Sequence, residues 1–354
     1  MSELEKICAG PLAFSEAAAA ESKRRWDAIA KPLGSLGLLE TAVTDIARLT
    51  GSADVKIDKR AVFVMCADNG VVREGVTQTG QEVTAIVAGK IAAGEGSVCH
   101  MAGKAGADVF AVDMGMASDV RGTIVRKTRR GTDNIAEGPA MTRADAESAV
   151  LAGIGLVREA KEQGYGIIVT GEMGIGNTTT SSAVLSAFLK IPPEKAAGRG
   201  AGLSDAGLER KISAIRRAIE INRPDENDVL DVLSKVGGLD ICGMAGLFIG
   251  GAVYRIPVVI DGFISAVSAL AAKKLCPCAE KAMLASHVSA EPAARAVLEA
   301  LRKKPLICAE MRLGEGTGGV CLLPLLDLAL AEYNGMSTFA DVGVEAYTPQ
   351  GGKG

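Results

Sequence analysis

From residue 60 onward, short runs of β-branched residues alternate with longer stretches at helical spacing, and this alternation constrains the fold most strongly. Each run ends at Gly, Asp, Glu or Ser and is followed by a segment long enough for a helix. Strand and helix repeats of this length predict a doubly wound α/β fold with a mostly parallel sheet. About six strands are expected, at residues 61–66, 108–112, 166–170, 256–260, 282–286 and 306–309.

The segments between these strands carry apolar residues near helical spacing and are expected to be helices. The predicted helices lie at 81–93, 142–163, 178–190, 204–221, 240–253, 263–273 and 291–302. The first 50 residues also have helical patterns, at 11–30 and 36–48. We therefore expect a smaller helical domain at 1–55, completed by 330–354, beside a Rossmann-like α/β catalytic domain at 56–329.

Composition and charge limit the partners and the compartment. The 39 basic and 42 acidic side chains give a formal net charge of −3, so no global positive field attracts a nucleic-acid backbone. The most apolar stretch, 241–254, meets Arg255, Pro257 and Asp261 before it reaches the ~20 residues of a membrane span. The first ten residues contain two glutamates and no basic segment ahead of an apolar run, so we expect a cytoplasmic protein.

Potential metal ligands are scattered along the chain. None of the eight cysteines forms a C-x-x-C pair, and His100 and His287 are the two histidines. This supply does not favour a structural zinc site, so we expect no metal and interpret the cysteines as buried, reduced thiols.

Polar residues follow the predicted strands at the point where each strand ends. Because the carboxyl ends of parallel strands meet at one edge of a sheet, these side chains are expected to share a ligand-binding rim. Any one of them alone is also a common cap or turn residue. The rim residues are Asp68, Asp113, Glu172, Asp261, His287 and, in the loop after the last strand, Glu315.

Three glycine-rich segments adjoin this rim. Residues 171–180 leave a strand and open a helix, where backbone amides can hold a phosphate, although a simple tight turn is the alternative. The segment has neither the P-loop ending nor the dinucleotide G-x-G-x-x-G spacing. Residues 198–204 precede a helix in which Lys211 offers a cation to the same phosphate, unless it is a solvated lysine. Residues 313–319 hold Glu315 between two glycines, which suits a carboxylate that meets a ligand closely.

Ordered motifs along nearly the whole chain resemble the nicotinate-nucleotide:dimethylbenzimidazole phosphoribosyltransferase family of cobamide biosynthesis. They are KPLGSLG at 31–37, ADNGV at 67–71, EVT at 82–84, GEMGIGNTT at 171–179, GRGAGL at 198–203, DGFIS at 261–265, SHVSAE at 286–291 and LGEGTG at 313–318. The resemblance implies transfer of the 5-phosphoribosyl group of nicotinate mononucleotide to an aromatic lower-ligand base. The implied products are an α-riboside 5′-phosphate and nicotinate.

The resemblance also implies roles for individual residues. Glu315 is the implied general base, and Glu172 is an implied second acidic group beside the reacting ribose. The implied phosphate and ribose cradle is Gly174, Gly176, Asn177, Thr178, Thr179, Lys211, Ser289 and Gly316. The implied pocket for the acceptor base is Gln81, Thr77, Met173 and Leu313.

No cofactor is implied, because nicotinate leaves from a formally cationic nitrogen and needs no metal to assist it. The family acts as a dimer, so the implied partner is a second identical chain or a paralogue.

Some positions depart from the family pattern and leave the acceptor open. They are TQTGQ at 77–81, Lys90 and PAAR at 292–295. The alternatives are a benzimidazole, a phenol or a purine. Two other classes also stay open. A nucleotide-binding subunit without turnover is disfavoured by the intact Glu172 and Glu315, and an NAD-dependent oxidoreductase lacks its glycine fingerprint.

Overall fold

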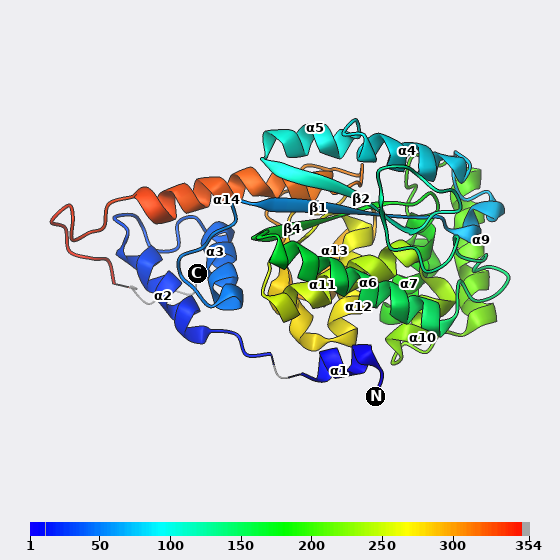
Figure 1. The fold of residues 1–354 in the computed structure, drawn as a ribbon, viewed down its shortest axis with the longest axis horizontal. Helices are drawn as coiled ribbons and strands as arrows, with labels where there is room; N and C mark the ends of the chain where they lie inside the picture. Colours follow the sequence, from blue (N-terminus) through cyan, green and yellow to red (C-terminus); the bar gives the residue numbers. More distant parts are fainter. Residues whose placement is uncertain (11, 349–354) are drawn as a thin grey trace.

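The structure is a computed structural model that describes residues 1–10 and 12–348. Within these residues lies a six-stranded sheet in the order β3-β2-β1-β4-β5-β6, and every pairing in it is parallel (Figure 1). The predicted doubly wound α/β fold is confirmed. The strands are β1 (Arg60–Ala67), β2 (Ala107–Gly115), β3 (Ile124–Val125), β4 (Ile167–Met173), β5 (Val258–Ile260) and β6 (Met283–Ala285).

Helices cover both faces of the sheet (Figure 1). One face carries α4 (Glu82–Ala92), α5 (Ser97–Lys104) and α14 (Thr317–Gly335), and α3 (Leu38–Thr50) packs into the same hydrophobic core. The opposite face carries α6 (Arg143–Glu162), α7 (Asn177–Leu189), α10 (Val229–Val236), α11 (Leu239–Tyr254), α12 (Phe263–Leu275) and α13 (Ala294–Leu301). The remaining helices are α1 (Glu3–Ala9), α2 (Glu16–Ala28), α8 (Pro193–Ala196) and α9 (Asp205–Asn222), with 3-10 turns η1 (Gly70–Glu74) and η2 (Pro277–Ala282).

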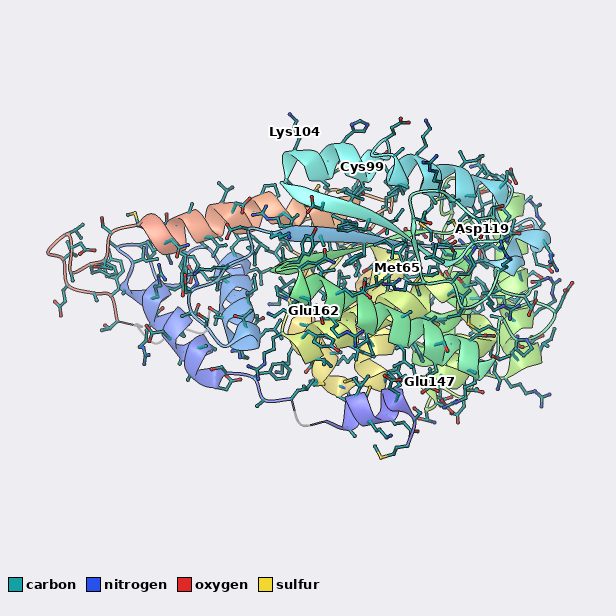
Figure 2. The ribbon with its side chains drawn as sticks, in the orientation of Figure 1. Met65, Cys99, Lys104, Asp119, Glu147 and Glu162 are labelled. Carbon is teal, nitrogen blue, oxygen red and sulfur yellow. The ribbon has the colours of Figure 1, made fainter. Side chains whose placement is uncertain are left out.

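The central strand β1 shows why the sheet needs two helical layers. All eight of its residues are buried, and successive side chains point to opposite faces. Phe63 and Met65 pack into the core with α6 and α11, whereas Val62 and Val64 pack into the core with α3 and α14. Figure 2 shows Met65 inside the molecule and Lys104 projecting outward from α5.

The helices α6 and α11 cross at glycines. A Cβ atom on Gly153 would lie 2.1 Å from the carbonyl oxygen of Gly243, and one on Gly246 would lie 2.1 Å from that of Val150. Backbone meets backbone at this crossing, because no side chain stands between the helices. The close contact packs α11 against α6 on one side of the sheet.

The helices α2 and α3 lie to one side of the sheet, beside the end of α14 (Figure 1). The rings of Trp26 and Tyr333 have centroids 4.8 Å apart, and the backbone N–H of Phe339 donates to the carbonyl of Ala28 at 3.0 Å. Helix α1 packs elsewhere, with Leu4 in the core that contains α11. The expected domain boundary at 329/330 falls inside α14. Residues 349–354, which were expected to help complete the helical domain, lie outside the described residues. The division into domains stays a prediction.

Several predicted elements need correction. The expected strand at 306–309 is wrong, since Ile307 makes only an isolated bridge with His287. Pro305 has no N–H to donate there, which limits pairing. The two-residue strand β3 and the helices α1, α5, α8 and α10 were not predicted, because they are short or lack a clear period. The helix expected at 291–302 begins at Ala294, and that expected at 11–30 begins at Glu16, with residue 11 outside the described residues.

Among the described residues, no helix is both long enough and apolar enough to cross a membrane. The most apolar helix, α11, is buried instead between α6 and α12.

Candidate active site

A cavity of about 290 Å³ lies beyond the carboxyl ends of β4, β5 and β6. Glu172 near the end of β4, Asp261 just after β5 and His287 just after β6 line it, and Glu315 reaches it from the loop before α14. The loop at 76–79 after β1 closes another side. The strand order reverses between β1 and β4, and ligands of doubly wound sheets bind at such a point.

Most of the predicted site residues line this cavity. They are Glu172, Met173, Gly174, Gly176, Asn177, Thr178, Ser289, Leu313, Glu315 and Thr77. Four others lie behind or beside the lining. Lys211 is fully buried behind Thr178, Thr179 is buried within α7, Gly316 packs against Gly171 at the start of α14, and Gln81 lies beside Asp68 just before α4. The roles of all these residues stay predictions.

Glu172 is a buried acid of the cavity. Its carboxylate accepts a hydrogen bond from the side-chain amide of Asn177, whose nitrogen also donates to Asp240 Oδ2 at 3.0 Å. The pKa of Glu172 is raised to about 8, chiefly by burial and also by the nearby carboxylates of Asp240, Asp261 and Glu315, against the lowering effect of the Asn177 amide. Glu172 is therefore suited to hold a proton near neutral pH.

Asp261 is held by the first turn of α14. Its Oδ1 accepts a hydrogen bond from the backbone N–H of Gly319 at 2.8 Å. Burial raises the pKa of Asp261 to about 7, against the lowering effect of these backbone donors. A Cβ atom on Gly318 would lie 2.0 Å from His287 Nδ1, so this glycine leaves room for the imidazole. Burial lowers the pKa of His287, which favours its neutral form.

Glu315 occupies an uncommon backbone conformation. Its φ is 61°, in the left-handed region, and the flanking Gly314 and Gly316 have φ values of 89° and 95°. A non-glycine residue in this region costs roughly 1–3 kcal/mol, and such residues cluster at functional sites. A Cβ atom on Gly314 would lie 2.3 Å from Glu172 Oε1, so a glycine at this position lets the two acidic segments approach each other.

The part of the cavity at the start of α7 is suited to an anion. Helix α7 begins after Gly176, whose φ of 94° turns the chain from β4 into the helix. Lys211 Nζ donates to Thr178 Oγ1 at 2.9 Å and to the carbonyl of Gly198 at 3.0 Å. Burial lowers the pKa of Lys211 to about 8. A helix N-terminus with a lysine behind it favours a phosphate.

Two members of the expected rim lie elsewhere. Asp68 Oδ2 accepts from the backbone N–H of Ala117 at 2.7 Å, and Asp113 Oδ1 accepts from that of Met116 at 2.8 Å. Asp113 also pairs with Lys127 at 3.0 Å. The prediction that these two aspartates line the ligand site is wrong, because they stabilise the loops that follow β1 and β2.

Sequence reasoning did not single out Asp240 or Arg199. Arg199 lies within a glycine-rich motif and lines the cavity, whereas Asp240 is fully buried in the first turn of α11. Within the described ranges, no group of three or more His, Cys, Asp or Glu side chains is arranged to hold a metal ion.

A Rossmann-ordered sheet with an acidic cavity beside a helix N-terminus is typical of α/β enzymes that act on nucleotide-like substrates. A family model described as phosphoribosyltransferase matches residues 13–344. The chain belongs to the family whose curated members are called nicotinate-nucleotide–dimethylbenzimidazole phosphoribosyltransferases, and it is an enzyme of that kind. Membership of this family, which the sequence motifs indicated, is confirmed.

Individual relatives match over nearly their full length. The chain is 48% identical to the enzyme of that name from Acetivibrio thermocellus, over 93% of this chain and 94% of the relative. It is 46% identical to that from Ruminiclostridium cellulolyticum, over 93% and 94%. A crystal structure of CobT from Thermus thermophilus matches with a TM-score of 0.88 at 38% identity, over 93% of this chain and 99% of that one.

Proposed function

We propose that this enzyme moves the 5-phosphoribosyl group of nicotinate mononucleotide onto an aromatic base of the dimethylbenzimidazole type. The products are an α-riboside 5′-phosphate and nicotinate, and the step belongs to cobamide nucleotide-loop assembly. One observation carries the proposal. Glu172 and Glu315 line the same cavity as the start of α7. That arrangement provides acidic groups beside the reacting ribose and its acceptor, and a cradle for a phosphate, in a single site.

The reaction divides into bond breaking and proton transfer. The C1′–N bond of the nucleotide breaks, and its electron pair returns to the cationic ring nitrogen, so nicotinate leaves as a stable pyridine. The acceptor nitrogen bonds to C1′ from the opposite face, which inverts the β-glycoside to an α-glycoside. In the proposed roles, Glu315 takes the acceptor N–H proton and Glu172 lies beside the ribose. The protein otherwise contributes by positioning two flat molecules.

The phosphate is proposed to bind where α7 begins. Gly174, Gly176, Asn177 and Thr178 line this end of the cavity, and Ser289 approaches it from the segment after β6. Lys211 supplies positive charge from behind Thr178. Thr179 and Gly316 do not line the cavity, and in this proposal they support the residues that form the phosphate cradle.

The acceptor is proposed to bind near Thr77, Met173 and Leu313, which line the cavity together. Leu313 is 56% exposed and offers an apolar surface that a flat aromatic base would cover. Gln81 lies outside the lining, next to Asp68, and would act on the loop at 76–79 that carries Thr77. A phenol or a purine would use the same surface.

We further propose a dimer in the cytoplasm. The dimer follows from the family resemblance, and the exposed Val342, Val344 and Tyr347 after α14 supply apolar surface that a partner would bury. The cytoplasm agrees with the cysteines, since all eight lie in the described part of the chain as free thiols. Reduced thiols are typical of that compartment.

The test is incubation of the purified protein with nicotinate mononucleotide and a panel of benzimidazoles, purines and phenols. Mass spectrometry would follow nicotinate release and riboside phosphate formation. The proposal expects one riboside phosphate per nicotinate with a benzimidazole. A product with phenols or purines alone would change the acceptor, and tight nucleotide binding without any product would favour a binding subunit.

A further inference from the structure

The carboxylate of Asp240 lies directly beneath the loop that forms the phosphate end of the cavity. Asp240 is fully buried, although it does not line the cavity. A Cβ atom on Gly174 would lie 2.6 Å from Asp240 Oδ2, and one on Gly238 would lie 2.5 Å from Oδ1. Two glycines thus leave the space that this carboxylate fills, and side chains at either position would displace it.

The Asn177 amide joins Asp240 to the cavity. Its nitrogen donates to Glu172 and, at 3.0 Å, to Asp240 Oδ2, so both amide hydrogens point at carboxylates. A side-chain amide has two N–H donors on one atom, and its oxygen would be repelled by either acid. The second oxygen of Asp240 accepts from the backbone N–H of Ile241 at 2.9 Å, which fixes the carboxylate to α11.

We infer that Asp240 is a positioning residue. It orients the amide of Asn177 and, through that amide, holds the carboxyl group of Glu172 in place beside the reacting ribose. The inference rests on the proposed function for the role of Glu172. The contacts themselves do not depend on that function, because they are formed within the protein.

The charge of Asp240 also acts on Glu172. Burial is the largest cause that raises the pKa of Glu172, and Asp240 is the first of the neighbouring acids that raise it further, while the Asn177 amide lowers it. The groups that face Glu172 from the surrounding elements are Asn177 from α7, Asp240 from α11, Asp261 after β5, Glu315 before α14 and the thiol of Cys66 on β1. Removing the Asp240 charge should lower the pKa of Glu172, and removing the Asn177 amide should raise it.

The experiment measures kcat/KM against pH for the wild-type enzyme and two variants. Asp240→Asn keeps an oxygen that accepts from Asn177 but loses the charge, so the ionisation attributed to Glu172 should move to lower pH. Asn177→Ala should move it to higher pH. Each variant should lower kcat/KM by about 10- to 100-fold, as expected for a displaced reacting group. Asp113→Asn, at a buried aspartate outside the cavity, is the control and should move nothing.

Opposite displacements in the two variants would support the inference. A profile that stays in place in both, or that moves in the same direction, would overturn it. A purely structural role would lower stability without moving the profile. If Asp240→Asn does not fold, Gly238→Ala displaces the Asp240 carboxylate while keeping its charge, and unchanged kcat/KM in that variant would also overturn the inference.

A further readout separates this inference from the proposed function. The pKa of the Glu172 carboxyl, followed by carbon NMR of protein labelled at glutamate, requires no turnover. If the wild-type enzyme releases no nicotinate, the proposed function fails. Even then, a difference in the pKa of Glu172 between the wild-type protein and Asp240→Asn would show whether Asp240 acts on Glu172.

Discussion

The carboxylate of Glu315 accepts a hydrogen bond from the backbone N–H of Val98, with Oε2 3.2 Å from the nitrogen. The bond connects the loop before α14 to the first turn of α5, on the same face of the sheet. It holds one oxygen of the proposed general base and leaves the other for a ligand. Helix α5 is therefore part of the support of the site, although none of its residues lines the cavity.

Glu315→Gln should lower kcat by about 10²- to 10⁴-fold, the usual contribution of a general base. The amide keeps the shape of the side chain and removes its basic oxygen, so binding of nicotinate mononucleotide should change little. Nicotinate release and calorimetric binding would check both expectations. The matched control is Glu310→Gln, an exposed glutamate of the same segment that also has a left-handed φ, of 52°. Full turnover in Glu315→Gln would remove this residue from the mechanism.

Lys211→Met should raise KM for nicotinate mononucleotide by about 10- to 100-fold, since charge-assisted bonds to phosphate contribute roughly 1.5–3 kcal/mol. In the wild-type enzyme KM should also rise above pH 8, because the pKa of Lys211 is lowered to about 8 and the cation is lost there. That rise should vanish in the variant. Initial rates between pH 6 and 9 provide the measurement, with exposed Lys195→Met as control. Equal KM values in Lys211→Met and wild type would contradict the phosphate role.

The sheet and its order of elements could be predicted because the hydrophobic periods are local properties of the sequence. The two-residue strand β3 and the isolated bridge at Ile307 could not be predicted, because their pairing depends on neighbours that are distant in the chain. The same limit applies to the site. Glu172 and Glu315 could be predicted because both lie in glycine-rich segments after predicted strands, whereas Asp240 looks like an ordinary first-turn acid of a helix.

The contrast between Asp113 and Asp261 shows that an acid near a strand end cannot be assigned to the ligand cavity from sequence alone. Asp113 lies near the end of β2 and Asp261 directly follows β5, but Asp113 binds the backbone of Met116 and the side chain of Lys127, whereas Asp261 lies in the cavity. The two positions look alike in sequence because a carboxylate serves equally well as a turn acceptor and as a ligand group. Only the position of each strand within the sheet separates them.

Gly314→Ala should reduce activity strongly. Its new methyl group would lie 2.3 Å from Glu172 Oε1, and the φ of 89° is strained for alanine. Gly164→Ala is a matched control, because that glycine also has a positive φ, of 82°, and has open space around its Cβ position. Both variants should lose some stability by thermal unfolding, but only Gly314→Ala should lose most of its kcat. Comparable activity in the two would contradict the close approach of Gly314 and Glu172.

The stability of the free enzyme should fall as pH rises from 5 to 8. The pKa values of Asp240, Asp261 and Glu172 are raised to about 6, 7 and 8, so the folded protein keeps protons that the unfolded chain releases. The unfolded state then binds fewer protons, and the free energy of unfolding decreases with pH until all three groups are ionised. Burial lowers the pKa of His287. At pH values below the ordinary pKa of histidine, this group therefore makes the free energy of unfolding rise with pH and opposes the trend.

Urea unfolding at pH 5, 6.5 and 8 would measure this dependence. Glu172→Gln cannot ionise and should therefore flatten the decrease between pH 6.5 and 8. A wild-type free energy of unfolding that rises over the whole range would contradict the assignment of protonated acids to the free cavity.

Two glycines of α6 should respond oppositely to alanine. Gly155→Ala meets nothing within 4 Å and should stabilise the protein by about 0.5–1 kcal/mol, as expected for removing a glycine from a helix. Gly153→Ala would place a methyl 2.1 Å from the carbonyl oxygen of Gly243, and should cost more than about 3 kcal/mol because backbone must move. Thermal and urea unfolding of the pair test the crossing, and similar effects at both sites would contradict it.

The central claim is that the enzyme exchanges nicotinate for an aromatic base at C1′ with inversion. The most direct measurement is the proton NMR spectrum of the product formed from nicotinate mononucleotide and dimethylbenzimidazole. The account predicts an α-riboside 5′-phosphate in one-to-one ratio with released nicotinate. A β-configured product, or nicotinate released together with free ribose 5-phosphate and no riboside, would contradict it.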